Sequence, residues 1–133
     1  GLALLAQRIE ATIARAAGEA RLAEYASALS AALKRIGVAT RAAWATADAQ
    51  AALANATPYM QAFGHVVLAW IWLDVALCAQ RLVSEAAPAR AALQGKLAAC
   101  RYFFRYELPR IEAWLGVVES RDDTCRSMAV ESF

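Results

Sequence analysis

The sequence predicts an all-α fold, in which long antiparallel helices form an up-and-down bundle. Alanine, the strongest helix former, is abundant, whereas no alternating run of β-branched residues bounded by turn signals suggests a sheet. Only three prolines and six glycines occur among the 133 residues, and Pro58 and Pro88 fall where long helices would divide. We expect one domain over residues 1–133, because this length suffices for a single hydrophobic core, with residues 120–133 as a tail.

The first part of the chain predicts two helices. Apolar residues three and four positions apart indicate a first helix from Leu2 to about Gly18. A second helix is expected from Leu22 to Ala51, with a less regular pattern toward its end. Gly37 lies inside this helix and costs up to about 1 kcal/mol relative to alanine, which indicates a bend or a close contact with another helix there.

A third helix is predicted from Pro58 to Glu85. Thr57 is a good N-cap, and Pro58 then occupies the first turn, where its missing N–H is harmless. The helix is expected to end at a turn formed by Ala86-Ala87-Pro88. Because this connection is short, the next helix should lie antiparallel to the third.

A fourth helix is predicted from Pro88 to about Val118. Pro109 should kink it near Arg105, because proline removes a backbone hydrogen bond. Residues 101–106 interleave arginine with tyrosine and phenylalanine, a pattern that can serve single-stranded nucleic acid or a phosphate-bearing ligand. An aromatic seam against another helix is the favoured interpretation, since acids and bases are mixed along the chain and the net charge is only +2. We therefore expect no nucleic-acid partner.

Residues 53–74 are the most informative segment, because the helix they predict is apolar nearly all round. Trp70 and Trp72 lie about 200° apart around a helix, so one neighbouring layer cannot cover both. We expect part of this surface to contact another chain or a part of the protein outside this sequence. The apolar run from Val66 to Ala79 is broken by Asp74 and is shorter than the roughly 20 residues that span a bilayer, so no membrane span is predicted.

Composition argues against several other classes of protein. Arg8, Glu10 and Arg15 interrupt the first helix, which therefore does not resemble a signal peptide. The three cysteines are widely spaced and match neither a disulfide framework nor a zinc motif, which favours the reducing cytoplasm. With one histidine, no Gly-x-Ser-x-Gly elbow and no Gly-rich phosphate loop, the residues indicate no catalytic, metal or cofactor site.

Two titratable side chains have predicted structural roles. His65 is expected to serve packing or hydrogen bonding. Asp74 is the one charge in the apolar half of the third helix, and a buried carboxylate needs a partner. When the third and fourth helices are paired about their turn, Asp74 lies level with Arg101. We therefore predict a structural ion pair between Asp74 and Arg101, or between Asp74 and Lys96.

Two strings carry a resemblance to a known family: LANATPYMQAFG, from Leu53 to Gly64, and KLAACRYFFRYELPR, from Lys96 to Arg110. In their order and spacing, the chain resembles the C-terminal domain of acetyl-CoA-dehydrogenase-like acyl-CoA dehydrogenases over essentially its whole length. The resemblance implies that the parent protein is an FAD-dependent enzyme of fatty acid metabolism, which oxidises an acyl-CoA to the 2,3-enoyl-CoA.

The catalytic glutamate of such enzymes belongs to a Tyr-Glu-Gly-Thr-like motif that precedes this domain. No such motif occurs here, because Tyr106-Glu107 is followed by Leu-Pro and Glu24 precedes its tyrosine. The resemblance therefore implies that this segment has no catalytic residue and binds no FAD by itself.

The implied role is a helical module that packs on an upstream dehydrogenase core, on a second subunit of a homo-oligomer, or on both. Because aromatic anchors dominate interfaces, the candidate interface residues are Trp70, Trp72, Phe103, Tyr106 and Trp114. Two alternatives remain: a stand-alone helical module that binds an apolar ligand or a membrane surface, and an oligomerisation bundle with no enzyme attached. The absence of an initial methionine favours a segment of a larger protein.

Overall fold

The computed structural model describes residues 1–85 and 88–133, and within these ranges the chain contains helices and no strand. The predicted all-α fold is confirmed. The longer helices are α1 (Leu2–Ala17), α2 (Ala23–Ala43), α4 (Ala56–Val83), α5 (Arg90–Tyr102) and α6 (Ile111–Ser120). The shorter elements are α3 (Ala49–Ala52), η1 (Phe103–Glu107), η2 (Leu108–Arg110), α7 (Thr124–Ser127) and η3 (Val130–Ser132). Two residues of the predicted turn, Ala86 and Ala87, lie outside the described residues.

The second helix is shorter than the sequence predicts. It ends at Ala43, and the separate helix α3 begins six residues later. Asp48 caps α3, because its carboxylate accepts a hydrogen bond from the backbone N–H of Gln50 at 3.0 Å. The backbone N–H of Asp48 in turn donates to the hydroxyl of Thr46 at 3.2 Å. These local hydrogen bonds compete with helix continuation and divide the predicted helix in two.

Helix α4 begins at Ala56, two residues before the predicted start, and its N-cap is Asn55. The prediction of Thr57 as the N-cap is therefore wrong. The Asn55 side chain makes no capping bond, since its Nδ2 donates to the carbonyl oxygen of Asp122 at 2.8 Å. Pro58 still lies in the first turn, where the backbone N–H groups have no partner within the helix.

Pro109 interrupts the fourth predicted helix, as the sequence predicts. Proline has no N–H to donate to the carbonyl of Arg105, and the backbone there leaves the α-helical pattern. It passes through the π-helix η1 and the 3-10 helix η2 before α6 begins. The N–H of Leu108 bonds to the carbonyl of Phe103, five residues earlier. This change of pitch lets α5 and α6 both pack on α4.

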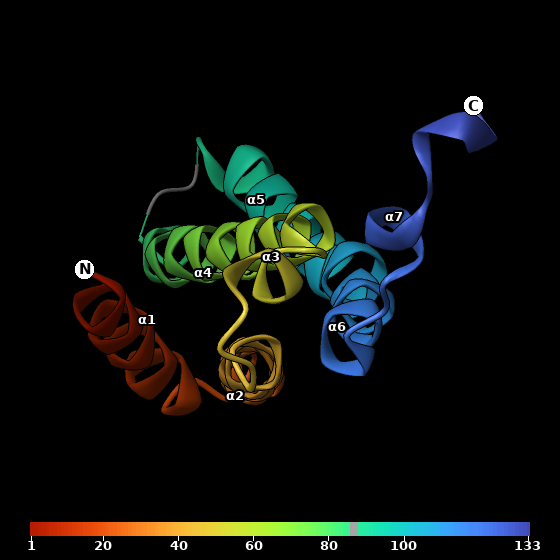
Figure 1. The fold of residues 1–133 in the computed structure, drawn as a ribbon. Coiled ribbons are helices and arrows are strands. Elements are labelled where there is room, and N and C mark those ends of the chain that lie inside the picture. Colours follow the sequence, from red (N-terminus) through yellow and green to blue (C-terminus); the bar gives the residue numbers. More distant parts are fainter. Residues whose placement is uncertain (86–87) are drawn as a thin grey trace.

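Helix α4 lies at the centre of the molecule, with α1 and α2 on one side and α5 on the other (Figure 1). Helix α6 packs on both α2 and α4. The inner face of α4 is a stripe of residues three or four positions apart, all of them at most 2% exposed: Ala62, Val66, Ala69, Leu73, Ala76 and Ala79. Small residues on this stripe allow the neighbouring helices to approach closely.

Helix α4 is, among the described residues, the one helix that is long and apolar enough to cross a membrane. The apolar run from Val66 to Ala79 is thus part of a longer apolar helix of 28 residues, and the absence of a membrane span stays a prediction. A core helix of a soluble protein meets the same criterion. In α4, 33% of the most apolar 18-residue window is buried, and the helix packs against α1, α2, α5 and α6.

The C-terminal segment extends away from the helices (Figure 1). Its residues from 121 onward are exposed, and Phe133 is 93% exposed. Polar contacts hold its first part, because Arg126 pairs with Asp48 at 3.4 Å and Asn55 binds the backbone of Asp122.

Candidate functional site

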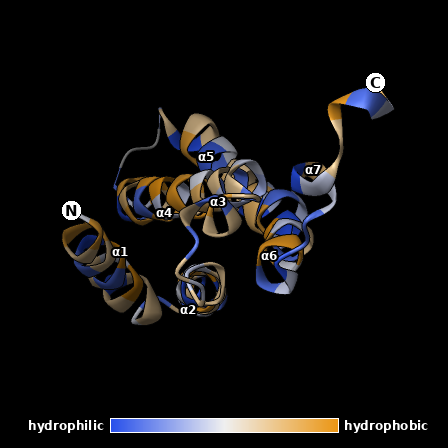
Figure 2. Cartoon of the chain, viewed as in Figure 1, coloured by the Kyte–Doolittle hydropathy of each residue, from blue (hydrophilic) through white to orange (hydrophobic). Residues whose placement is uncertain are grey.

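One side of α4 presents large apolar side chains to solvent. Met60, Leu68, Ile71 and Leu82 are 60%, 45%, 47% and 38% exposed, respectively. They recur at helical spacing roughly opposite the inner face, and Cys78 on the same side is also exposed. We call these five residues the outer face of α4. Hydrophobic colours prevail along α4 in Figure 2, in agreement with a helix that is apolar on both its inner and its outer sides.

The five aromatic residues predicted as interface contacts differ in how far they are exposed to solvent. Phe103 is 8% exposed and belongs to the domain's own core, so it is not available to a partner. The indole Nε1 of Trp70 donates to the hydroxyl of Thr12 at 2.9 Å, which orients this ring toward α1. Trp72 and Trp114 are partly buried against the core. Tyr106 alone among the five is largely exposed, at 66%.

The predicted ion pair of Asp74 is wrong. Its carboxylate binds the guanidinium of Arg15 on α1 at 2.6 Å, and not Arg101 or Lys96 on α5. Because Arg15 belongs to α1, Asp74 lies on the side of α4 that faces α1, whereas α5 lies on the opposite side of α4 (Figure 1). The two side chains are 60% and 50% exposed. Solvent screening makes a pair of this kind a weak contribution to stability.

His65 forms a polar cluster with residues of the fourth predicted helix. Its Nε2 lies 3.2 Å from Oε2 of Glu107, and Nη1 of Arg110 donates to the same oxygen at 3.0 Å. The ring of Trp114 packs edge-on against His65, at 4.7 Å between centroids, and the Arg110 guanidinium lies 5.4 Å from the Trp114 ring. The predicted hydrogen-bonding role of His65 is confirmed. This cluster fixes η1 and α6 on α4.

The His65 cluster makes part of the stability depend on pH. The hydrogen bond with His65, followed by that with Arg110, holds the pKa of Glu107 below its ordinary value of 4.5. A carboxylate with a lowered folded-state pKa stabilises the fold above the unfolded pKa, and this contribution is lost as the pH falls through the folded pKa. We expect Glu107→Gln to lower the free energy of unfolding at about pH 5.5 more than at about pH 3.

Urea denaturation at the two pH values measures this difference. Glu131→Gln, in the exposed element η3, is the matched control and should change the stability equally little at both. A Glu107→Gln effect that is the same at the two pH values would contradict the role assigned to this carboxylate.

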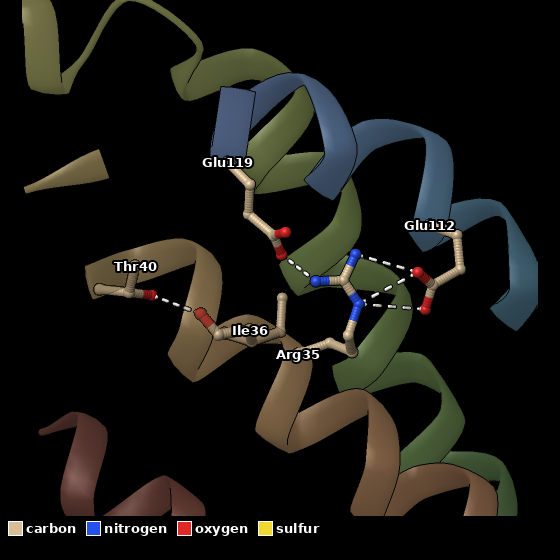
Figure 3. Close-up of polar contacts among 5 residues, drawn as sticks. All are labelled: Arg35, Ile36, Thr40, Glu112 and Glu119. Atoms are coloured by element: carbon tan, nitrogen blue, oxygen red, sulfur yellow. Dashed lines mark hydrogen bonds and ion pairs between the residues drawn. The ribbon is translucent and has the colours of Figure 1, made fainter. Parts of the chain in front are cut away.

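Arg35 bridges α2 to α6 through two carboxylates (Figure 3). Its Nε donates to Glu112 at 3.0 Å, and its Nη2 lies 2.9 Å from the same carboxylate. Its Nη1 binds Glu119. Glu112 and Glu119 are seven residues apart, so they lie on the same side of α6. The side chains of Arg35 and Glu119 are each only 29% exposed, which reduces solvent screening.

We expect Arg35→Gln to lower the free energy of unfolding by about 1–2 kcal/mol, because hydrogen bonds to charged groups contribute about this much and two carboxylates lose their shared cation. Arg105→Gln is the matched control. Arg105 lies 3.7 Å from Glu24, and both side chains are at least half exposed, so its loss should cost less than about 0.5 kcal/mol. Equal effects of the two substitutions in urea denaturation would refute the bridging role.

A groove of about 550 Å³ lies between α1, α2 and α4. Its apolar lining includes Leu2, Leu5, Ile9 and Ile13 of α1, Leu33 and Ile36 of α2, and Phe63, Val66 and Val67 of α4. Glu10, Lys34 and Arg41 supply its charged groups. Gly37 does not lie at the expected close contact with another helix. It lines the groove, and helix α2 continues past this glycine to Ala43.

Little in the described residues resembles a catalytic centre. No group of three or more His, Cys, Asp and Glu side chains in residues 1–85 and 88–133 could hold a metal ion. Burial raises the pKa of the Cys100 thiol to about 12, which leaves it protonated and unreactive at neutral pH. Cys78 and Cys125 are free and exposed.

A family model, described as acetyl-CoA dehydrogenase C-terminal like, matches residues 5–129. The chain belongs to this family. Comparisons with curated proteins and with solved structures found no match. The resemblance noted in the sequence is thereby confirmed. In this acetyl-CoA dehydrogenase C-terminal like domain, the string from Leu53 to Gly64 covers the three residues before α4 and the start of α4. The string from Lys96 to Arg110 covers the end of α5 with η1 and η2.

Sequence reasoning missed two features of this acetyl-CoA dehydrogenase C-terminal like domain. The first is the Arg35 bridge, for which the seven-residue spacing of Glu112 and Glu119 was the available signal. The second is the groove, because its three walls come from helices whose relative placement the sequence does not specify. The apolar spacing of Leu2, Leu5 and Ile9 was visible but is typical of any core-facing helix.

Proposed function

We propose that the chain is the C-terminal helical module of an FAD-dependent acyl-CoA dehydrogenase, a cytoplasmic enzyme of fatty acid metabolism that oxidises acyl-CoA to 2,3-enoyl-CoA. The module is not itself catalytic. It packs against the dehydrogenase core or a second subunit of a homo-oligomer. The outer face of α4 is the observation that carries this role, and Tyr106 and the partly buried Trp72 and Trp114 are further candidate contacts.

The outer face fits a packing surface better than an isolated solvent-facing helix. Single exposed apolar residues are normal, but an apolar stripe along one helix marks an interaction site. Met60 and Leu82, the two ends of this stripe, are 22 positions apart in α4, which corresponds to roughly 33 Å of helix. The only Asp, Glu, Lys or Arg residues of the helix are Asp74 and Arg81, so a partner would desolvate few charges there.

The described residues do not fit an FAD site of their own. A flavin dinucleotide needs donors for its pyrophosphate, typically the N–H groups of a Gly-rich loop at a helix N-terminus. The groove between α1, α2 and α4 is instead lined mainly by aliphatic side chains. FAD would therefore be held by other parts of the parent enzyme, and no reaction step is assigned to this chain.

Removal of the module from the parent enzyme tests this proposal. An enzyme that lacks residues 1–133 should retain bound flavin, as measured by its visible absorption, because no flavin contact is lost. It should have a lower native mass by light scattering, or expose apolar surface to a hydrophobic dye, because the packing surface is removed. Loss of the flavin with unchanged assembly would contradict the assigned role.

A further inference from the structure

We propose that the groove between α1, α2 and α4 binds a monomeric single-chain amphiphile with an anionic headgroup, such as a long-chain carboxylate. This site is separate from the outer face of α4. Residues of α1, α2 and α4 line this groove. The inference therefore goes beyond the packing role of the outer face and can be tested without flavin or a partner protein.

The groove has the size and lining of a small-molecule site. Such sites typically enclose about 300–1,000 Å³ and are mainly apolar, and this groove has a volume of about 550 Å³ with nine large apolar side chains in its walls. The volume and the apolar walls therefore suit a single apolar chain.

Positive charge at the groove favours an anionic headgroup. Lys34 and Arg41 are seven residues apart and thus lie on the same side of α2. They face one acidic residue, Glu10 of α1, so the three side chains together carry a net charge of +1. Among the ion pairs of residues 1–85 and 88–133, none includes Lys34 or Arg41. Both cations are therefore available to a ligand.

Gly37 gives the Arg41 side chain room to reach the groove. A Cβ atom at Gly37 would lie 3.5 Å from Nη1 of Arg41, so the guanidinium extends back over this glycine. The neighbouring hydroxyl of Thr40 is already engaged, because it donates to the carbonyl of Ile36 at 2.7 Å and lies 2.8 Å from the Tyr59 hydroxyl. Arg41 is therefore the side chain best placed to bind a carboxylate above the apolar floor.

Isothermal titration calorimetry of the 133-residue chain tests the headgroup. Dodecanoate, below the concentration at which it forms micelles, should bind at one site and more tightly than the neutral dodecanol. Arg41→Gln should weaken dodecanoate binding by about 2- to 5-fold, the range of a partly exposed ion pair, and leave dodecanol binding unchanged. Equal binding of the two probes, unaffected by Arg41→Gln, would overturn the assignment of the headgroup.

A substitution that fills the groove tests whether the apolar chain of the ligand binds there. Gly37→Leu places a side chain in the groove and replaces glycine by a better helix former, so the variant should fold at least as stably as the original chain. It should bind neither probe. Gly116→Leu is the matched control, because a Cβ atom there meets nothing within 4 Å, and it should retain binding. Undiminished binding by Gly37→Leu, or binding to anionic phospholipid vesicles without binding of monomeric dodecanoate, would overturn the proposal.

Discussion

Leu73→Ala is expected to lower the free energy of unfolding by about 2–5 kcal/mol, the usual range for a leucine truncated in a packed core. The Leu73 side chain is fully buried at 0% exposure, in the middle of the inner face of α4. Its nearest neighbours on that face, Ala69 and Ala76, are too small to fill the space that the truncation leaves. Because single domains are stabilised by only about 5–15 kcal/mol in total, this substitution should be visible at once in urea denaturation.

Leu68→Ala provides the matched comparison on the same helix. It removes the same atoms five residues earlier, but Leu68 is 45% exposed on the outer face. We expect a loss below about 1 kcal/mol in the 133-residue chain, because little buried surface disappears. Equal losses for the two leucines would mean that the inner and outer faces of α4 have been assigned incorrectly.

The double substitution Leu68→Glu with Ile71→Glu should have its largest effect on assembly. In the 133-residue chain it should change the free energy of unfolding by only about 0.5 kcal/mol, since both side chains are exposed. In the parent protein it introduces two carboxylates into the proposed packing surface. Each replaced anchor of such a surface typically costs about 2 kcal/mol, which is roughly a 30-fold weakening of association. Native mass by light scattering measures the result.

The reactivity of the native Cys78 thiol reports whether a partner covers the outer face of α4. Cys78 is exposed on the outer face of α4, so a partner that covers this face should protect its thiol from alkylation in the parent protein. The double variant should remove the protection, whereas Cys125 in the exposed C-terminal segment should react equally in both proteins. Val38→Glu, at a 44% exposed position of α2, is the control substitution. An outer-face variant with unchanged mass and unchanged Cys78 reactivity would exclude this packing surface.

The features that the sequence predicted correctly depend on short stretches of chain. Pro109 disrupts the helix wherever the helix packs, because the missing N–H is a property of the residue itself. The apolar character of α4 on all sides is likewise visible in residues 53–74 alone. Helix ends were harder to place. The start of α3 depends on a single hydrogen bond to the Asp48 side chain, and the Asn55 side chain binds the distant Asp122 instead of capping α4.

The features that the sequence could not supply depend on which helices become neighbours. Asp74 was assigned to the helix that follows it in the chain, but its position around α4 turns it toward α1 and Arg15. Phe103 was expected at an interface, but the π-helical turn of η1 places it in the core. The groove arises in the same way, since its walls come from three helices that are distant in the sequence.

We propose that this helical domain is part of a flavoenzyme. The intact mass and visible absorption spectrum of the native protein, purified from its source, test it most directly. We expect a chain several times heavier than the 14.3 kDa of these 133 residues, together with the absorption bands of bound flavin. A colourless native protein of 14.3 kDa would contradict the account and identify the chain as a stand-alone helical module.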